Sequence, residues 1–340
     1  MASLDIFNSD VFGLTSLSLA VEKVPYQPML LGEMGIFTPK PITTLNFGIE
    51  SRQGVLTLIP NSERGAPPSQ AGSIRRVVRD FRTGRLIKDD QIHSHEIIGV
   101  RSFGTESEMQ TVMEMVAQRQ LALRNDLELT LENQRLGAVQ GVVIDADGST
   151  TIIDWYAAFG LSVPSEIAFT NSAVTTALGM IPFLNANVVR PMRRSVGAAN
   201  FGAINALCGD NFFDWLTSHA DVKATYLNWQ AAADLRQSRA FESFSFGGIN
   251  WINYRGTDDN STVAIGTSKV RFFTSGVPGL FQHIMSPAES MDAVGTLGRP
   301  TYSQILNDPT GRNAFVTLEV AAYPAMVCSR PESLLRGAYS

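Results

Sequence analysis

The sequence is poor in charge and in cysteine. Only 17% of its 340 residues are charged, below the share of about a quarter that is usual in soluble proteins, although 44% are hydrophobic. Such a shortage is typical of a subunit that hides much of its surface in an assembly. The two cysteines, Cys208 and Cys328, lie in no Cys/His cluster, which excludes a zinc finger or a disulfide scaffold. We expect two buried free thiols, with one long-range disulfide as the alternative.

Several functional signatures are also missing. The N-terminus lacks the basic and apolar regions of a signal peptide, and no apolar run reaches the length of about 18 residues that a membrane span needs. The sequence contains no G-x-x-x-x-G-K-[ST], G-x-G-x-x-G or G-x-S-x-G motif. We therefore expect a protein that folds in a reducing cytoplasm, binds no membrane and uses no cofactor.

The charges that are present are unevenly distributed. Residues 64–88 hold seven basic residues and one acid, Asp80, and so carry +6, while the other 20 basic and 31 acidic residues give −11. This basic strip contains one aromatic residue, Phe81, and lacks the interleaved aromatics of single-strand binders. A nucleic-acid site and a solvated loop are possible interpretations, but we favour a contact between copies of the chain. The candidate contact residues are Arg64, Arg75, Arg76, Arg79, Arg82, Arg85 and Lys88.

The strip lies within a predicted finger. Residues 1–45 contain four prolines and little periodicity, so we expect an extended arm. Residues 46–60 predict strand, turn and strand around Gly54, and 92–100 predict the returning strand. A two-stranded ribbon is marginally stable alone and must lie on its own body or on a neighbour.

A long helix is predicted over 105–136. It starts with a capping box, Thr105 followed by Glu108, and Gly137 is the expected stop. At 1.5 Å per residue this helix would be about 48 Å long, which indicates an elongated body. Its apolar positions recur at three-to-four spacing: Met109, Val112, Met113, Val116, Leu123, Leu127 and Leu131.

The C-terminal half predicts a mixture of helices and strands. Residues 141–155 form a hairpin with its turn at Asp147-Gly148. Helices are predicted over 175–184, 192–207, 210–219 and 221–235, and strands over 241–254, 263–273, 314–323 and 326–328.

Two groups of residues invite a catalytic or metal interpretation. His93 and His95 alternate on a predicted strand and could share a face, but two ligands do not make a metal site, and a polar strand face is the simpler explanation. Asp145 and Asp147 bracket a turn, where aspartate commonly makes local hydrogen bonds. We therefore expect no catalytic residue and no metal ligand.

Motifs in a fixed order carry a resemblance to a known family. They are Gly54-Val55-Leu56-x-Leu58-Ile59-Pro60 with Arg64-Gly65; Glu96-Ile97-Ile98-Gly99-Val100-Arg101-Ser102-Phe103-Gly104; Asp145-Ala146-Asp147-Gly148 with Asp154-Trp155; Pro300-Thr301-Tyr302 to Asp308-Pro309-Thr310; and Arg330-Pro331-Glu332. With these motifs the chain resembles the lambda-type tailed-phage major capsid proteins, the capsid protein E family, over nearly its whole length.

The resemblance implies an α+β chain with the Hong-Kong-97-type capsid fold. Its parts would be an N-terminal arm (1–45), an E-loop hairpin (46–95), a P-domain (96–165 and 276–320) that holds the spine helix (105–136), and an A-domain (166–275 and 321–340).

The resemblance also implies a function. The chain would be no enzyme but the major capsid protein of a tailed bacteriophage. It would assemble in the host bacterial cytoplasm as hexamers and pentamers into an icosahedral virion shell around double-stranded DNA, without sequence-specific binding. A separate scaffolding protein and a portal are expected partners, and a decoration protein is a further possibility. The alternatives are an encapsulin-like compartment shell and a metal-dependent enzyme using His93 and His95.

Overall fold

The structure is a computed structural model that describes residues 30–52, 76–99, 108–176, 179–197, 202–223, 243–254, 263–312 and 314–339. Helices and strands are mixed along these residues, which confirms the α+β class. The thiols of Cys208 and Cys328 are both free and buried, as predicted. Among the described residues, no helix has the length and apolarity needed to cross a bilayer.

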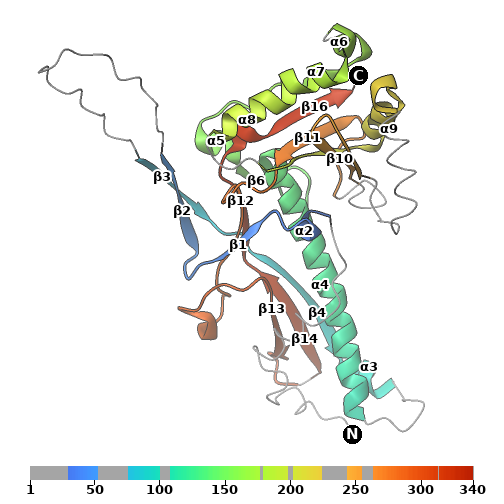
Figure 1. Ribbon diagram of the computed structural model, residues 1–340. Coiled ribbons are helices and arrows are strands. Elements are labelled where there is room, and N and C mark those ends of the chain that lie inside the picture. The colour runs from blue at the N-terminus through green and yellow to red at the C-terminus, as the bar shows by residue number, and fades with distance from the viewer. Residues whose placement is uncertain are drawn as a thin grey trace, which may run out of the picture.

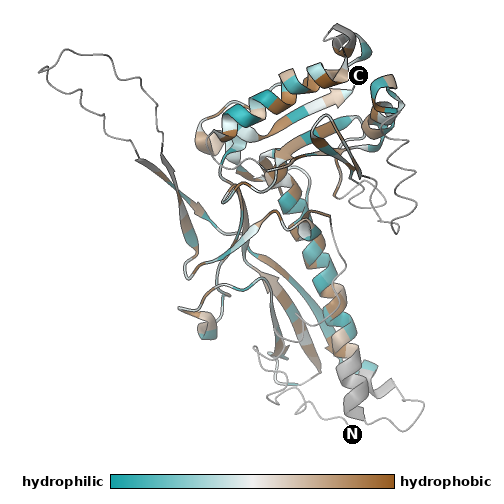
Figure 2. Ribbon diagram, viewed as in Figure 1, coloured by the Kyte–Doolittle hydropathy of each residue, from teal (hydrophilic) through white to brown (hydrophobic). Residues whose placement is uncertain are grey.

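One helix, α4 (Glu108–Gln140), determines the long axis of the molecule. Its 33 residues make it about 50 Å long, and Figure 1 shows it running from the lower tip of the body to the upper sheet. Teal and brown segments alternate along it in Figure 2, as expected of a helix with one face in the core. Thr105 of the predicted capping box lies outside the described residues. The positions that α4 buries at three-to-four spacing include Val116, Gln120, Leu123, Leu127 and Leu131.

The prediction that Gly137 ends this helix was wrong. Gly137 lies inside α4, where a Cβ atom would come within 2.8 Å of the Val143 Cα atom. Glycine is needed there because strand β5 (Val142–Ile144) passes directly against the helix. The helix instead ends before Gly141, which has a φ of 85° that favours glycine.

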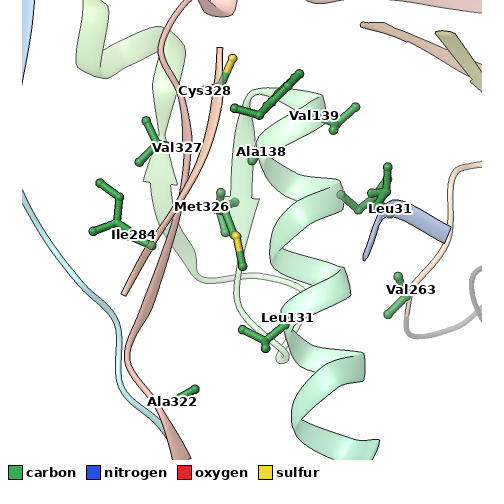
Figure 3. Packing of buried hydrophobic residues seen from close by; sticks show 14 of the residues in the cluster. Leu31, Leu131, Ala138, Val139, Val263, Ile284, Ala322, Met326, Val327 and Cys328 are labelled. Carbon is green, nitrogen blue, oxygen red and sulfur yellow. The ribbon is translucent and has the colours of Figure 1, made fainter. Parts of the chain in front are cut away.

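Two three-stranded sheets lie beside α4. The first has the order β13 (Tyr302–Asn307), β14 (Phe315–Ala322), β4 (Leu86–His93), with both pairs antiparallel. The second joins β1 (Thr38–Pro41), β12 (Phe281–Met285) and β15 (Pro324–Cys328). Figure 3 shows side chains of β12 and β15 on one side of α4 and Leu31 of the short helix α2 (Leu30–Glu33) on its other side, and all belong to one buried cluster.

A hairpin and two short helices complete this part of the fold. Strand β5 pairs with β6 (Thr151–Asp154) as the predicted hairpin, and helix α5 (Trp155–Phe159) follows it directly. After β4, residues 94–99 form the helix α3 (Ser94–Gly99), so the strand predicted over 92–100 ends at His93. Residues 94–99 of the predicted strand therefore lie outside the sheet.

A six-stranded sheet forms the other end of the molecule (Figure 1). Its core cluster is separate from the one around α4 and is rich in aromatic rings. The helix predicted over 192–207 ends at Val196, and residues 204–208 form the strand β8, which is buried at all five positions and paired on both sides. In order the strands are β7 (Ile167–Phe169), β16 (Leu335–Tyr339), β11 (Lys269–Thr274), β8 (Ile204–Cys208), β10 (Ile249–Asn253) and β9 (Ser243–Phe246).

Helices pack on this sheet, and single helical turns occur in the connections. The stretch from Met180 to Val196 is helical throughout, with a π-helical turn in its middle. The helices are α6 (Asn171–Thr176), α7 (Met180–Leu184), η3 (Asn185–Val189), α8 (Arg190–Val196) and α9 (Asp210–Ser218), and the single turns are η4 (Met291–Ala293) and η5 (Pro331–Ser333). The division into arm, E-loop, P-domain and A-domain stays a prediction.

Candidate subunit interface

Part of the basic strip lies on a hairpin that projects from the body. Strand β2 (Asn46–Arg52) pairs antiparallel with β3 (Arg76–Arg82), and Figure 1 shows the pair extending away from α4. The returning strand was predicted over 92–100, so this pairing is a correction. The reason is that the segment containing Ile92 is the body strand β4, held across its whole length by β14. Gly54 and its predicted turn lie outside the described residues.

Aromatic contacts fix the base of this hairpin. The ring of Phe81 stacks on Phe47 at 5.7 Å and lies 5.1 Å from the ring of Trp155. The Arg79 guanidinium lies 5.3 Å from the Phe159 ring centre, a cation–π distance. Both Trp155 and Phe159 belong to α5, so the inner face of β3 is attached to the body. Its outer face stays open, since the Val78 residue is 62% exposed.

The candidate contact residues occupy different surroundings. Arg64 and Arg75 lie outside the described residues, and Arg76 begins β3. Arg82 is exposed on the outer face of the same strand. Arg85 and Lys88 are already paired within the chain: the Arg85 Nε atom lies 2.7 Å from Glu289, and the Lys88 Nζ atom lies 2.6 Å from Asp126. Exposed ion pairs of this kind contribute at most about 1 kcal/mol, so they leave both residues accessible to a partner.

The structure brings His93 and His95 together, but not through the strand alternation that the sequence predicts. Their rings stack with centres 5.4 Å apart, although His95 lies on α3 and not on a strand. The nearby Glu96 carboxylate is already bound by Arg119 and accepts a hydrogen bond from the His93 backbone. Within the described residues, no group of three His, Cys, Asp or Glu side chains is placed to hold a metal ion.

The aspartates have local structural roles. The Asp147 carboxylate accepts hydrogen bonds from the Thr150 hydroxyl at 2.6 Å and from the Thr150 and Ser149 backbone amides at 2.8 and 2.9 Å, and these bonds lower its pKa. Asp154 caps α5 by accepting from Ala157 at 3.0 Å. Such turn and cap contacts agree with the structural interpretation of these residues.

A buried polar cluster on α4 was not found by sequence analysis. The fully buried Glu132 carboxylate accepts from the Leu31 and Gly32 backbone amides, at 2.7 and 3.1 Å, and from the Tyr254 hydroxyl at 3.3 Å. Its charge faces the Arg135 guanidinium at 3.3 Å. Burial raises the pKa of Glu132, while these contacts oppose that rise. The cluster ties α2 to the long helix, so its role is structural.

Comparisons with known proteins agree with this architecture. Residues 13–339 match the family model described as Phage major capsid protein E. The major capsid protein of Pseudomonas phage KPP10 is 25% identical over 343 residues, covering 93% of this chain and 95% of the relative. That of Salmonella phage Felix O1 is 22% identical over 354 residues, covering 95% of each.

Solved structures share the fold. The putative capsid protein of a prophage of E. coli CFT073 superposes with a TM-score of 0.61 at 12% identity, covering 96% of this chain and 99% of that one. The mature capsid subunit of bacteriophage PhiM1 gives a TM-score of 0.53 at 11% identity, covering 93% and 88%. The fold is therefore the predicted Hong-Kong-97-type capsid fold, and the chain belongs to the family of phage major capsid protein E.

Proposed function

We propose that this chain, a major capsid protein of a tailed phage, assembles as hexamers and pentamers into an icosahedral shell that encloses double-stranded DNA. The observation that supports this most directly is the match to the capsid family over residues 13–339. The match favours a phage shell over an encapsulin-like compartment and over a metal enzyme using His93 and His95. On this proposal the chain has no catalytic role.

The basic strip supplies the contact between subunits in this proposal. Its charge of +6 contrasts with −11 on the rest of the chain, so the strip of one copy is attracted to the body of the next. An acidic body also suits a container for DNA, because strongly basic inner walls would bind phosphates tightly. We expect shell assembly in the host bacterial cytoplasm with a separate scaffolding protein and a portal, and a decoration protein as a further partner.

Charge reversal on the strip tests this proposal. Arg79 is left unchanged because it packs on Phe159 at the base of the hairpin. We expect R75E/R76E/R82E to prevent shell formation and to leave the melting curve of the unassembled subunit unchanged. Particle formation is measured by sedimentation and electron microscopy.

The matched control is R75K/R76K/R82K, which keeps the charges and is expected to assemble. Intact shells from the glutamate variant, at the yield of the wild type, would contradict the role of the strip as a subunit contact.

A further inference from the structure

The loop between β12 and β13 presents an apolar surface to solvent. Met291 is 91% exposed, Val294 75% and Leu297 59%. Met291 and Val294 exceed every other large hydrophobic residue of the described chain in exposure. Single exposed apolar side chains are ordinary, but three within seven residues form a patch of the kind that marks an interaction site. We call these three residues the apolar knuckle.

The knuckle stands on a loop that is fixed at both ends. The Ser286 amide donates to the Tyr323 carbonyl at 3.1 Å, and the Gly298 amide donates to the Ile42 carbonyl at 3.0 Å. Gly298 approaches the backbone so closely that a Cβ atom would lie 2.1 Å from the Met285 carbonyl oxygen.

Contacts inside the loop hold it in the same way. Ala293, between two knuckle residues, is 4% exposed, and the Thr296 amide donates to its carbonyl at 3.1 Å. Glu289, just before the knuckle, pairs with Arg85. A partner therefore meets a preformed surface and pays little ordering entropy on binding.

The position of the loop indicates what covers it. In Figure 1 the short orange turn η4, which carries Met291, projects on the same side of α4 as the β2–β3 hairpin. A head-to-tail contact repeated around an axis closes into a ring, and each subunit then presents one edge to one neighbour. Arg85 of the basic strip pairs with Glu289, two residues before Met291, so the strip and the knuckle adjoin each other. The knuckle is thus continuous with the interface proposed for the basic strip.

We propose that the apolar knuckle packs against a second copy of this chain in the assembled shell. The inference rests on the proposed function, since it requires a shell built from copies. It assigns the apolar part of the contact to Met291, Val294 and Leu297, while the strip supplies charge. Burying these side chains stabilises the contact in proportion to the apolar surface that is removed from water.

Cysteine labelling tests this directly. The natural Cys208 and Cys328 are 0% exposed, so a cysteine placed at 291 or 294 is the reactive thiol of the folded described chain. M291C and V294C are each labelled with a maleimide as unassembled subunits and as shells made from this chain alone. We expect labelling to be at least about ten-fold slower in the shells, because a thiol buried in a contact is shielded from the reagent.

The outcomes separate this inference from the proposed function. Equal labelling rates in subunits and intact shells would overturn the inference and leave the shell in place. Protection that arises only when a scaffolding or decoration protein is added would assign the knuckle to that protein and also overturn it. A wild-type chain that forms no assembly under any condition would contradict the proposed function itself.

A second pair of variants gives an independent readout. We expect M291D/V294D to melt like the wild type, because both side chains are exposed in the subunit, but to lose shell assembly. M291L/V294I keeps the apolar character and is expected to assemble. Shells from the aspartate variant at wild-type yield would again overturn the inference.

Discussion

Glu132 shows how one residue holds a segment that lies far away in sequence. Its carboxylate receives the Leu31 and Gly32 amides and faces Arg135 in a buried setting. E132A leaves those donors without an acceptor and leaves Arg135 with the longer ion pair to Glu128 at 3.6 Å, so we expect a loss of about 3–5 kcal/mol of unfolding free energy. E132Q retains one accepting oxygen and is expected to lose less. Urea unfolding of the unassembled subunit measures both, and equal losses would contradict this role.

His283 makes the stability of the subunit sensitive to acid. It lies on β12, and burial, assisted by the positive charge of Arg135, lowers its pKa to about 4. The unfolded chain, with an ordinary histidine pKa of about 6.5, binds the proton more readily, so stability is lost as the pH falls from 6.5 towards 4. Over this pH window, the protonation of His283 lowers the free energy of unfolding by about 3 kcal/mol.

The variant H283Q removes this titration. We expect the wild type to lose about 3 kcal/mol more than H283Q between pH 7 and pH 4 in urea unfolding, because the other titrating groups are common to both. The same pH dependence in both proteins would show that His283 is not the source.

At the scale of single elements, sequence patterns succeeded where the signal is local. The helix predicted over 105–136 is α4, since its apolar spacing is carried by consecutive turns of one segment. The sequence patterns failed where pairing with distant chain segments determines the secondary structure. Residues 204–208 form the strand β8 because β10 and β11 pair with them, and no local feature of that segment announces these partners. The pairing of β2 with β3 was missed for the same reason.

For the substitution G137A, helix propensity predicts a gain in stability, whereas packing predicts a loss. Propensity alone favours G137A by about 1 kcal/mol. The added methyl group, however, would meet the Val143 Cα atom at 2.8 Å and the Val142 carbonyl oxygen at 2.9 Å. We expect a net loss of about 1–3 kcal/mol in thermal or urea unfolding, as for other overpacked sites. A more stable G137A protein would contradict the close packing of β5 on α4.

A control on the same helix isolates the propensity effect. Ala122 is exposed on α4, so A122G changes propensity without changing packing. It is expected to cost about 1 kcal/mol.

At the scale of the whole molecule, a low charge content and an uneven charge distribution fit a subunit covered by its own copies. The β2–β3 hairpin, which carries part of the basic strip, and the turn η4 of the apolar knuckle project on the same side of α4 (Figure 1). The sequence predicted the family and its fold through motifs in a fixed order. It did not reveal the knuckle, because Met291, Val294 and Leu297 are distinguished only by exposure in the folded chain.

Electron microscopy of the purified full chain tests the central claim most directly. Assembly from identical copies predicts uniform rings, tubes or polyhedral particles that become more abundant with protein concentration and less abundant with added salt, which screens the charged strip. A monomer without regular assemblies at every concentration, with or without a scaffolding protein, would contradict the claim that this chain builds a capsid shell.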